Sequence, residues 1–392
     1  MNHQMMCHLP PLPLISPRLH QWLADPLHHQ QRPLLLHLGD NLMATIPQAY
    51  NSTIEAIYRK FETNHVESSR AHLGASMIGR ECNRALWYGF RWATVPNFPG
   101  RVLRLFKRGH DEEDYFIRDL MSIGAQVWAV NPLTGKQYGC TFHGGHFAGS
   151  CDGVAKGLPE SPNKAHLLEF KTHNHKSFAL LKKQGVRESK PEHYAQMQVY
   201  MHGLGLQRAM YMAVSKDTDE MYAERFKYNK EDALALVEKA RTIIATDIPP
   251  PGISTRADFF KCKFCDHQDV CHRDELPQVN CRTCIHSHID MDQGGWRCLF
   301  HDKKISTDEQ RLGCEKHLYN HHLVPHEMVD MDAPGNSVKY RKVDGVEFYN
   351  SQKTAPGYYT SAEIKAAPAL LGDPGADNLR AAFGGVFVDG NE

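Results

Sequence analysis

The chain has 392 residues, of which 41% are hydrophobic, and its mean hydropathy of −0.50 is typical of a globular protein in water. Lysine and arginine together number 45, as do aspartate and glutamate, so any nucleic-acid surface must be a local patch. No apolar run reaches the roughly 18 residues of a membrane-spanning helix, which excludes a membrane role.

The start of the chain does not have the pattern of an export signal. Its apolar part is broken by prolines and no basic segment precedes it. We therefore expect a cytoplasmic protein in which clustered members of the eleven cysteines bind metal rather than form disulfides. Residues 1–42 lack periodicity and are predicted to be a disordered leader. We hypothesise that the native product starts at Met43, because the codons of the preceding Gly-Asp pair can form a purine-rich ribosome-binding site.

Hydrophobic periodicity predicts alternating helices and strands along the chain. The predicted elements are, in order, helices at 46–61, 82–92 and about 102–124, strands within 125–132, 143–157 and 166–173, a helix at 191–206, two strands within 209–228, and a helix at 230–246. This order predicts an α/β fold with a mixed central β-sheet flanked by helices. Beyond it we expect a cysteine- and histidine-rich module at 273–325. For 326–392 we predict a hairpin around Asp344-Gly345 and a loose tail.

An acid and a base lie two residues apart in the predicted strand 166–173. Side chains alternate along a strand, so Glu169 and Lys171 share one face and Leu168 and Phe170 the other. Asp152, on a preceding strand, is a candidate partner. Two carboxylates that converge repel each other unless a divalent cation lies between them, and Mg²⁺ prefers one or two carboxylates with phosphate oxygens. The simpler alternative is an ordinary cross-strand salt bridge.

Asp152 followed by Glu169-Phe170-Lys171 resembles the PD-(D/E)XK nuclease motif, although Cys151 replaces the proline. Gln196 and Tyr200 resemble the Q-x-x-x-Y pattern of the RecB-like branch, and the stretch 191–201 is similar to phage exonucleases of the lambda type. Glu113, four residues after a glycine, takes the position that is usually a histidine in RecB-like nucleases, and His110 lies nearby. The resemblance covers roughly residues 75–272 and implies that 43–272 form a restriction-endonuclease-like domain.

The resemblance implies a Mg²⁺- or Mn²⁺-dependent deoxyribonuclease. Glu113, Asp152 and Glu169 would hold the metal, and Lys171 would position the attacking water and stabilise developing charge. The remaining two motif residues, Gln196 and Tyr200, would contact DNA or brace the site, the alternative being ordinary helix surface and core.

Cys262, Cys265 and Cys271 provide three metal ligands, and Cys82 is a candidate for the fourth. The pattern is similar to AddB-type and CRISPR-associated RecB-like nucleases, which implies a structural 4Fe-4S cluster that closes the nuclease domain. Zinc in the same ligands, or a buried apolar Cys82, are the alternatives.

A second cysteine group follows at Cys281, Cys284, Cys298 and Cys314. Two cysteines separated by two residues, followed by two single ones, indicate a zinc site. The possible substitute ligands are His286, His288, His301 and His317. Because this segment is polar, we expect metal to supply its fold.

Basic residues flank the predicted site and suit phosphate contact or a solvated face: Arg101, Arg104, Lys107, Arg108, Lys182, Lys183, Arg187 and Lys190. The expected function is exonucleolytic DNA hydrolysis in phage or bacterial recombination. A non-catalytic nucleic-acid-binding protein and a structure- or site-specific endonuclease are the alternatives. No helicase P-loop is present, so unwinding would need a helicase or a single-strand annealing partner.

Overall fold

The computed structural model describes residues 52–65, 70–333 and 335–388. The predicted leader 1–42, the proposed start at Met43 and the first part of the helix predicted at 46–61 lie outside the described residues. Within the described part of the chain, no helix is both long enough and apolar enough to cross a bilayer.

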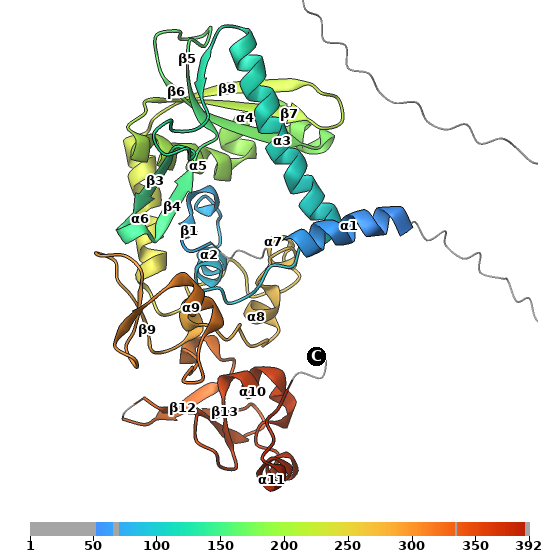
Figure 1. Ribbon diagram of the computed structural model, residues 1–392, viewed down its shortest axis with the longest axis vertical. Helices are drawn as coiled ribbons and strands as arrows, with labels where there is room; N and C mark the ends of the chain where they lie inside the picture. Colours follow the sequence, from blue (N-terminus) through green and yellow to red (C-terminus); the bar gives the residue numbers. More distant parts are fainter. Residues whose placement is uncertain (1–51, 66–69, 334, 389–392) are drawn as a thin grey trace, which may run out of the picture. The chain divides into compact units, whose positions relative to one another are not determined.

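The largest sheet, the central sheet of the α/β part, has five strands and lies in the upper part of the view in Figure 1. Its strands, in spatial order, are β2 (Gln126–Trp128), β5 (Gly153–Lys156), β6 (His166–His173), β7 (Arg208–Ser215) and β8 (Met221–Lys227). Strands β6 and β7 run parallel and the other neighbours run antiparallel. The predicted α/β class with a mixed central sheet is therefore confirmed.

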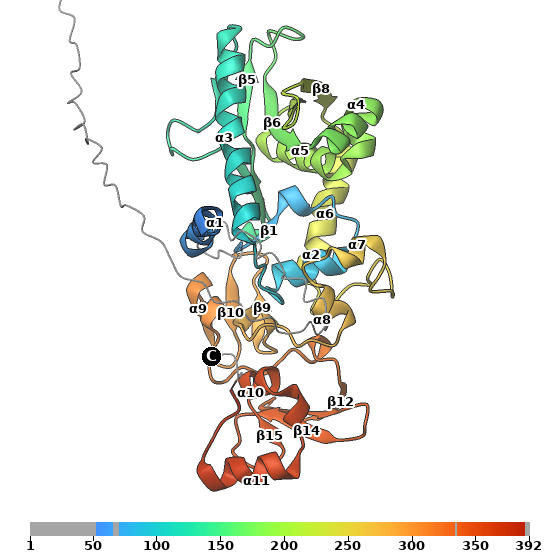
Figure 2. The same ribbon diagram turned by 90° about the vertical axis from the view of Figure 1, so that its right-hand side faces the viewer.

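Helices cover both faces of this sheet, with α3 on one side and α4 and α5 on the other (Figure 2). Their bounds are α3 Gly100–Ser122, α4 His175–Ser189 and α5 Pro191–Leu204. Alternation along β6 decides what each face buries. On one face, Phe170 stacks on Phe116 of α3 at 4.9 Å between ring centroids. On the other face, Leu167 belongs to the same hydrophobic cluster as Phe178 of α4.

Local sequence signals explain where these helices begin and end. The Asn174 side chain accepts a hydrogen bond from the Ser177 amide and caps α4. Helix α5 starts with Pro191 and ends before Gly205, whose φ of 68° is the left-handed conformation of a glycine cap. Sequence periodicity missed α4. Gly185, with a φ of 73°, interrupts it and weakens its helical pattern.

A second, three-stranded sheet lies beside the first, in the order β1 (Leu73–Gly74), β4 (Phe147–Ser150), β3 (Gly139–Phe142). The segment predicted as neighbouring strands at 143–157 is thus divided between two sheets, because the chain leaves the small sheet at Ser150 and enters the central one at Gly153. Three further helices complete this part: α1 (Ser52–Asn64), α2 (Asn83–Phe90) and α6 (Lys230–Ala245).

The cysteine-rich segment consists of short strands and helices, and its buried side chains belong to the same hydrophobic core as those of α2. Its elements are α7 (Phe260–Lys263), α8 (Gln268–His272), β9 (Ser287–Ile289), β10 (Trp296–Cys298), β11 (Lys303–Ile305) and α9 (Thr307–Leu312). Trp296 and Ile305 are buried in the same cluster as Phe90 of α2. Trp296 and the two isoleucines, Ile289 and Ile305, thus extend the core beneath α2.

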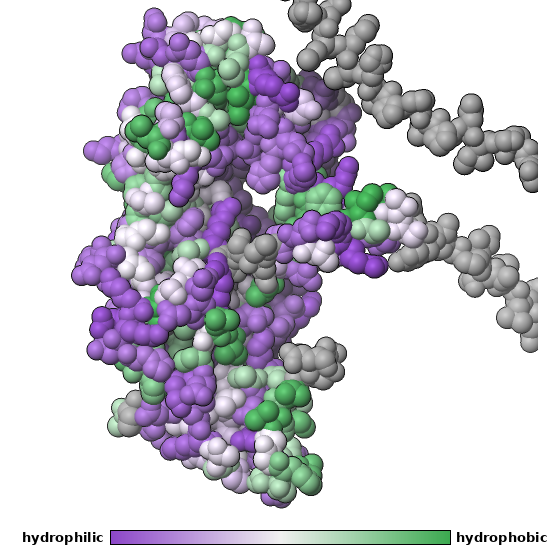
Figure 3. All heavy atoms as spheres, viewed as in Figure 1, coloured by the Kyte–Doolittle hydropathy of each residue, from purple (hydrophilic) through white to green (hydrophobic). Residues whose placement is uncertain are grey.

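The C-terminal part has a core of its own. Strands β12 (Glu327–Met331), β13 (Ser337–Arg341), β14 (Glu347–Ser351) and β15 (Tyr358–Tyr359) form a sheet in that order, followed by α10 (Ser361–Ala366) and α11 (Pro374–Phe383). The pairing of β13 with β14 confirms the predicted hairpin. The segment predicted as a loose tail contains two helices in the structure, capped by the side chains of Thr360 and Asp373. Apolar side chains gather around α11 on the face shown in Figure 3.

Short 3-10 helices connect several of these elements. They are η1 (Ala75–Met77), η2 (His143–Gly145), η3 (Cys281–Thr283), η4 (His321–Leu323) and η5 (Pro368–Leu370).

A buried arginine attaches the cysteine-rich segment to α2. The Arg282 guanidinium donates hydrogen bonds to the Phe90 carbonyl (2.8 Å), the Ala71 carbonyl (2.8 Å) and Oε1 of Gln310 (2.9 Å). It also lies 3.7 Å over the Trp92 ring. Arg282 forms no salt bridge with any described residue, and burial, with nearby arginines, lowers its pKa to about 9.

We predict that Arg282→Ala lowers the free energy of unfolding by about 3 kcal/mol or more, because it leaves buried carbonyls without donors. Urea unfolding followed by tryptophan fluorescence measures the change. Arg297→Ala is the matched control, since Arg297 pairs with Asp302 at the surface and its loss should leave the midpoint unchanged. Equal stability of both variants would contradict the role of Arg282.

Candidate functional site

Glu169 and Lys171 form an ion pair in the middle of the central sheet. Lys171 Nζ bonds Oε1 of Glu169, whose side chain is completely buried, whereas that of Lys171 is 26% exposed. The second carboxylate oxygen of Glu169, Oε2, is buried and has no hydrogen-bond partner among the described residues. A buried carboxylate oxygen without a donor is costly, so this atom is suited to a bound cation.

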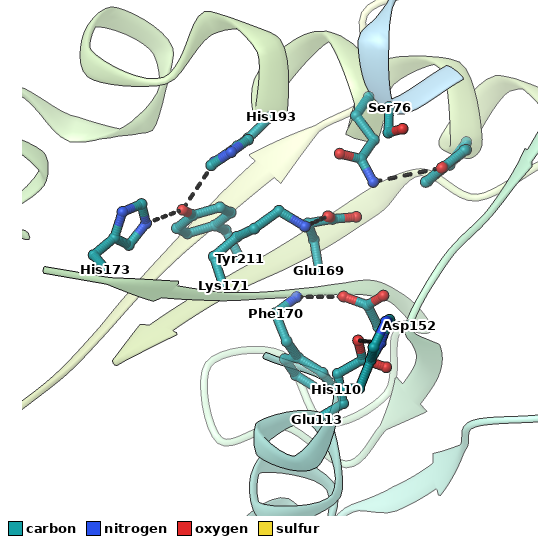
Figure 4. A network of polar contacts seen from close by, with 12 residues as sticks. Ser76, His110, Glu113, Asp152, Glu169, Phe170, Lys171, His173, His193 and Tyr211 are labelled. Carbon is teal, nitrogen blue, oxygen red and sulfur yellow. Dashed lines mark hydrogen bonds and ion pairs between the residues drawn. The ribbon is translucent and has the colours of Figure 1, made fainter. Parts of the chain in front are cut away.

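Two further carboxylates approach the same strand from its other side. Oδ2 of Asp152, just before β5, accepts a hydrogen bond from the Phe170 amide at 2.6 Å. Oε1 of Glu113, on α3, lies 3.3 Å from Nδ1 of His110. Figure 4 shows Glu169 and Lys171 on one side of β6 and Asp152, Glu113 and His110 on the other. The four predicted catalytic charges thus lie around β6 near the start of β5, with Glu169 and Lys171 on one side of the strand and the other two carboxylates on the opposite side.

The pKa values of the three carboxyl groups are raised. Burial is the main cause for each, and it raises the pKa of Glu169 to about 8. Repulsion from Asp152 adds to the effect at Glu113 and Glu169. Burial alone would lower the pKa of Lys171, but the three carboxylates outweigh it and the pKa is raised. The site thus holds more negative charge than one lysine neutralises.

Within the described residues, no three histidine, cysteine, aspartate or glutamate side chains are already arranged to enclose a metal ion. The donor chemistry nevertheless fits a divalent cation. Glu169 has a free buried oxygen, and the raised carboxyl pKa values would fall if a cation lay beside them. Oxygen ligands of this kind suit Mg²⁺ or Mn²⁺.

Gln196 and Tyr200 lie one turn apart on α5, and both are buried. Nε2 of Gln196 donates a 3.4 Å hydrogen bond to the Tyr200 hydroxyl. A Cβ on Gly149 of β4 would come within 2.7 Å of the Tyr200 ring, so this glycine permits the close contact. Their burial favours bracing of the site over direct contact with DNA.

Sequence reasoning missed a hydrogen-bonded group next to Lys171. The Tyr211 hydroxyl lies 2.9 Å from Nε2 of His173 and 3.0 Å from Nδ1 of His193 (Figure 4). Burial, with nearby lysines, lowers the pKa values of these histidines to about 4 and about 3, so both are neutral at pH 7. Periodicity could have found them, because His173 follows Lys171 by two on the strand and His193 precedes Gln196 by three on the helix.

The four cysteines of the first group, Cys82, Cys262, Cys265 and Cys271, line one pocket, although Cys82 is far from the others in sequence. The chemistry of four thiols fits a 4Fe-4S cluster or zinc. His267 also lines this cavity.

The four cysteines of the second group line one pocket: Cys281, Cys284, Cys298 and Cys314. His286, His301 and His317 line it too, but His288 does not. Burial, with the three other thiols, raises the pKa of Cys281 to about 12, which a bound cation would reverse.

The predicted basic residues are partly neutralised within the chain. Lys107 pairs with Asp111 and Lys182 with Glu220. Arg187 lies 3.7 Å from Asp232. Among the described residues, the other five form no salt bridge: Arg101, Arg104, Arg108, Lys183 and Lys190.

The sequence matches no protein-family model and no curated protein. Three solved structures resemble part of the chain. An alkaline exonuclease (LHK-Exo) from Laribacter hongkongensis is 17% identical, with 48% of this chain and 91% of that chain covered and a TM-score of 0.34. SSO0001 is 15% identical, over 56% and 96%, with a TM-score of 0.35. A phage related exonuclease from Haemophilus somnus 129PT is 10% identical, over 47% and 94%, with a TM-score of 0.30. Because every TM-score is below 0.5, we draw no conclusion about this chain from the likeness.

We predict that divalent-metal affinity rises with pH and levels off above about pH 8. Below that pH the Glu169 carboxyl holds a proton that the ion must displace, so the affinity should change by about tenfold per pH unit for one released proton. Calorimetric Mn²⁺ titration in buffers of different ionisation enthalpy measures affinity and proton release together. Glu169→Gln should lose this pH dependence, whereas pH-independent binding by the unaltered protein would contradict it.

Proposed function

We propose that the protein is a metal-dependent DNA nuclease that hydrolyses phosphodiester bonds at the site around β6. The observation that carries the proposal is the fully buried Glu169, whose Oε1 pairs with Lys171 while Oε2 has no partner among the described residues. Asp152 and Glu113 provide additional negative charge nearby. This arrangement has more negative than positive charge, and a divalent cation would supply the missing positive charge.

The roles of the residues follow from their charges and positions. A bound Mg²⁺ or Mn²⁺ would supply charge neutralisation and a more acidic water. Asp152, Glu113 and Glu169 would hold it. Lys171 stays protonated in this acidic surrounding. Its ammonium group can therefore orient a water molecule for attack on phosphorus and stabilise the charge that develops on the phosphate oxygens.

Further parts of the proposal concern setting and partners. We infer an exonuclease that processes DNA during phage or bacterial recombination, with a helicase or single-strand annealing protein as partner, since the sequence has no P-loop. A catalytic lysine paired with a buried glutamate favours an enzyme over a purely binding protein, because binding alone needs no such costly pair.

We also propose structural metals at both cysteine groups. Cys82, Cys262, Cys265 and Cys271 would hold a 4Fe-4S cluster, and the proposal is supported by their convergence on one cavity. The second set, Cys281, Cys284, Cys298 and Cys314, would hold zinc. Each metal would join segments that have few apolar residues of their own.

Lys171→Ala should abolish cleavage while folding is kept, because the ammonium group acts on the phosphate and on water. The measurement uses end-labelled linear DNA and circular DNA with Mg²⁺, Mn²⁺ or EDTA, and protein purified without oxygen. Lys164→Ala is a matched control, since Lys164 is exposed in the loop before β6.

Cleavage of linear DNA alone, lost in Lys171→Ala, is the expected result. Cleavage of circles would make the protein an endonuclease at the same site. Full activity of Lys171→Ala, or DNA binding without cleavage by fully folded protein, would contradict the proposed mechanism.

Cys82→Ser should remove the cluster and lower the melting temperature, because it removes the one thiol that comes from outside the 262–271 segment. Iron and zinc analysis with visible absorption of anaerobically purified protein reads out the metal directly. Cys140→Ser is the control, as Cys140 lies on β3 outside both cavities. Iron content equal to that of the unaltered protein would contradict the assignment of Cys82.

A further inference from the structure

A large cleft leads to the proposed catalytic site. Its empty volume, including the part open to solvent, is about 1990 Å³, and its lining includes Glu113, Phe170 and Lys171. It is also lined by Arg70, Arg80 and residues of the loop between α2 and α3. A cleft of this size, with the reactive charges at one end, can hold an extended ligand as well as the bond to be cleaved.

One face of α3 forms a wall of this cleft. Its five lining residues follow the helical repeat: Leu105, Phe106, Gly109, His110 and Glu113. The Phe106 side chain is 44% exposed, and its ring meets that of Phe98 edge-on at 5.1 Å between centroids. The exposed ring of Phe106 and the half-buried ring of Phe98 thus line the same cleft as Glu113.

Gly109 keeps space open between Phe106 and Glu113. A Cβ at this position would meet no atom within 4 Å, so no packing contact requires a glycine. Glycine inside a helix is less stable than alanine. A glycine without a packing role, on the helix face that lines the cleft, leaves room for a ligand chain to pass close to the helix backbone.

Positive charges line the same cleft. Arg70, Arg80 and Lys216 form no salt bridge with any described residue. The acidic lining residues are Asp266 and Glu113, and Glu113 belongs to the proposed metal site. The cleft therefore combines aromatic surfaces with cations, which is the composition of sites for single-stranded nucleic acid.

We propose that this cleft binds a single DNA strand, with bases against Phe106 and Phe98 and phosphates along Arg70, Arg80 and Lys216, and delivers it to Lys171. The inference rests on the proposed nuclease function and adds its substrate class. In a duplex the base faces are stacked on one another and cannot reach the phenyl rings, so strand separation must precede entry.

The test measures binding of three fluorescent probes in buffer without divalent cations. They are an oligothymidine strand, a strand of equal length made of abasic sites, and a blunt duplex. Phe106→Ala should weaken oligothymidine binding by about tenfold and leave the abasic strand unchanged, because only the stacking contact is lost. Tyr115→Ala is the control on the same helix, since Tyr115 is 56% exposed and does not line the cleft.

A second variant tests the space at Gly109. Gly109→Leu should keep or raise the melting temperature, because leucine is more stable than glycine inside a helix. It should lower the rate of single-strand cleavage at least tenfold, because the leucine side chain would fill the space proposed for the DNA strand. Unchanged oligothymidine affinity in Phe106→Ala, or equal loss for the duplex and the abasic strand, would overturn the inference. If either result is found and the unaltered protein still cleaves DNA, the single-strand inference fails but the nuclease proposal stands. Strand binding that depends on Phe106 without any cleavage by the unaltered protein would instead refute the nuclease proposal alone.

Discussion

The burial of Glu169 in the middle strand of the central sheet is the constraint on which the site depends. Desolvation raises its pKa, and the partial compensation comes from Lys171 two residues along the same face. Asp152 is held beside the strand by the Phe170 amide. These contacts fix the charged groups on rigid strands, so the reacting geometry is set by backbone hydrogen bonding rather than by flexible loops.

Much of this site could be predicted because short sequence periods determine it. Strand alternation placed Glu169 and Lys171 on one face, and helical spacing placed Gln196 and Tyr200 on one side of α5. The convergence of Cys82 with cysteines far along the chain is long-range, so spacing alone could not establish it. It was expected from family resemblance, and the structure brings these residues to one cavity.

Other features could not be read from periodicity. The transfer of the chain between sheets near Asp152 depends on which strand each segment pairs with, and a two-residue period is the same in both sheets. No local pattern around Arg282 indicates its partners, because two of them are carbonyls that lie far away in sequence. The cleft combines α3, β6 and the loop before α3, which no local pattern connects.

The shared core beneath α2 limits how this protein can be divided or recombined. A zinc-type segment that folds independently can be moved between proteins as a cassette, but here Trp296 is packed against Phe90 at 5.6 Å between ring centroids, and Arg282 lies over Trp92. A chain that ended at residue 272 would expose Phe90 and Trp92 to water and would have an apolar surface prone to aggregation. Duplication or exchange of the segment must therefore carry compensating changes in α2, and the two regions are expected to evolve as one unit.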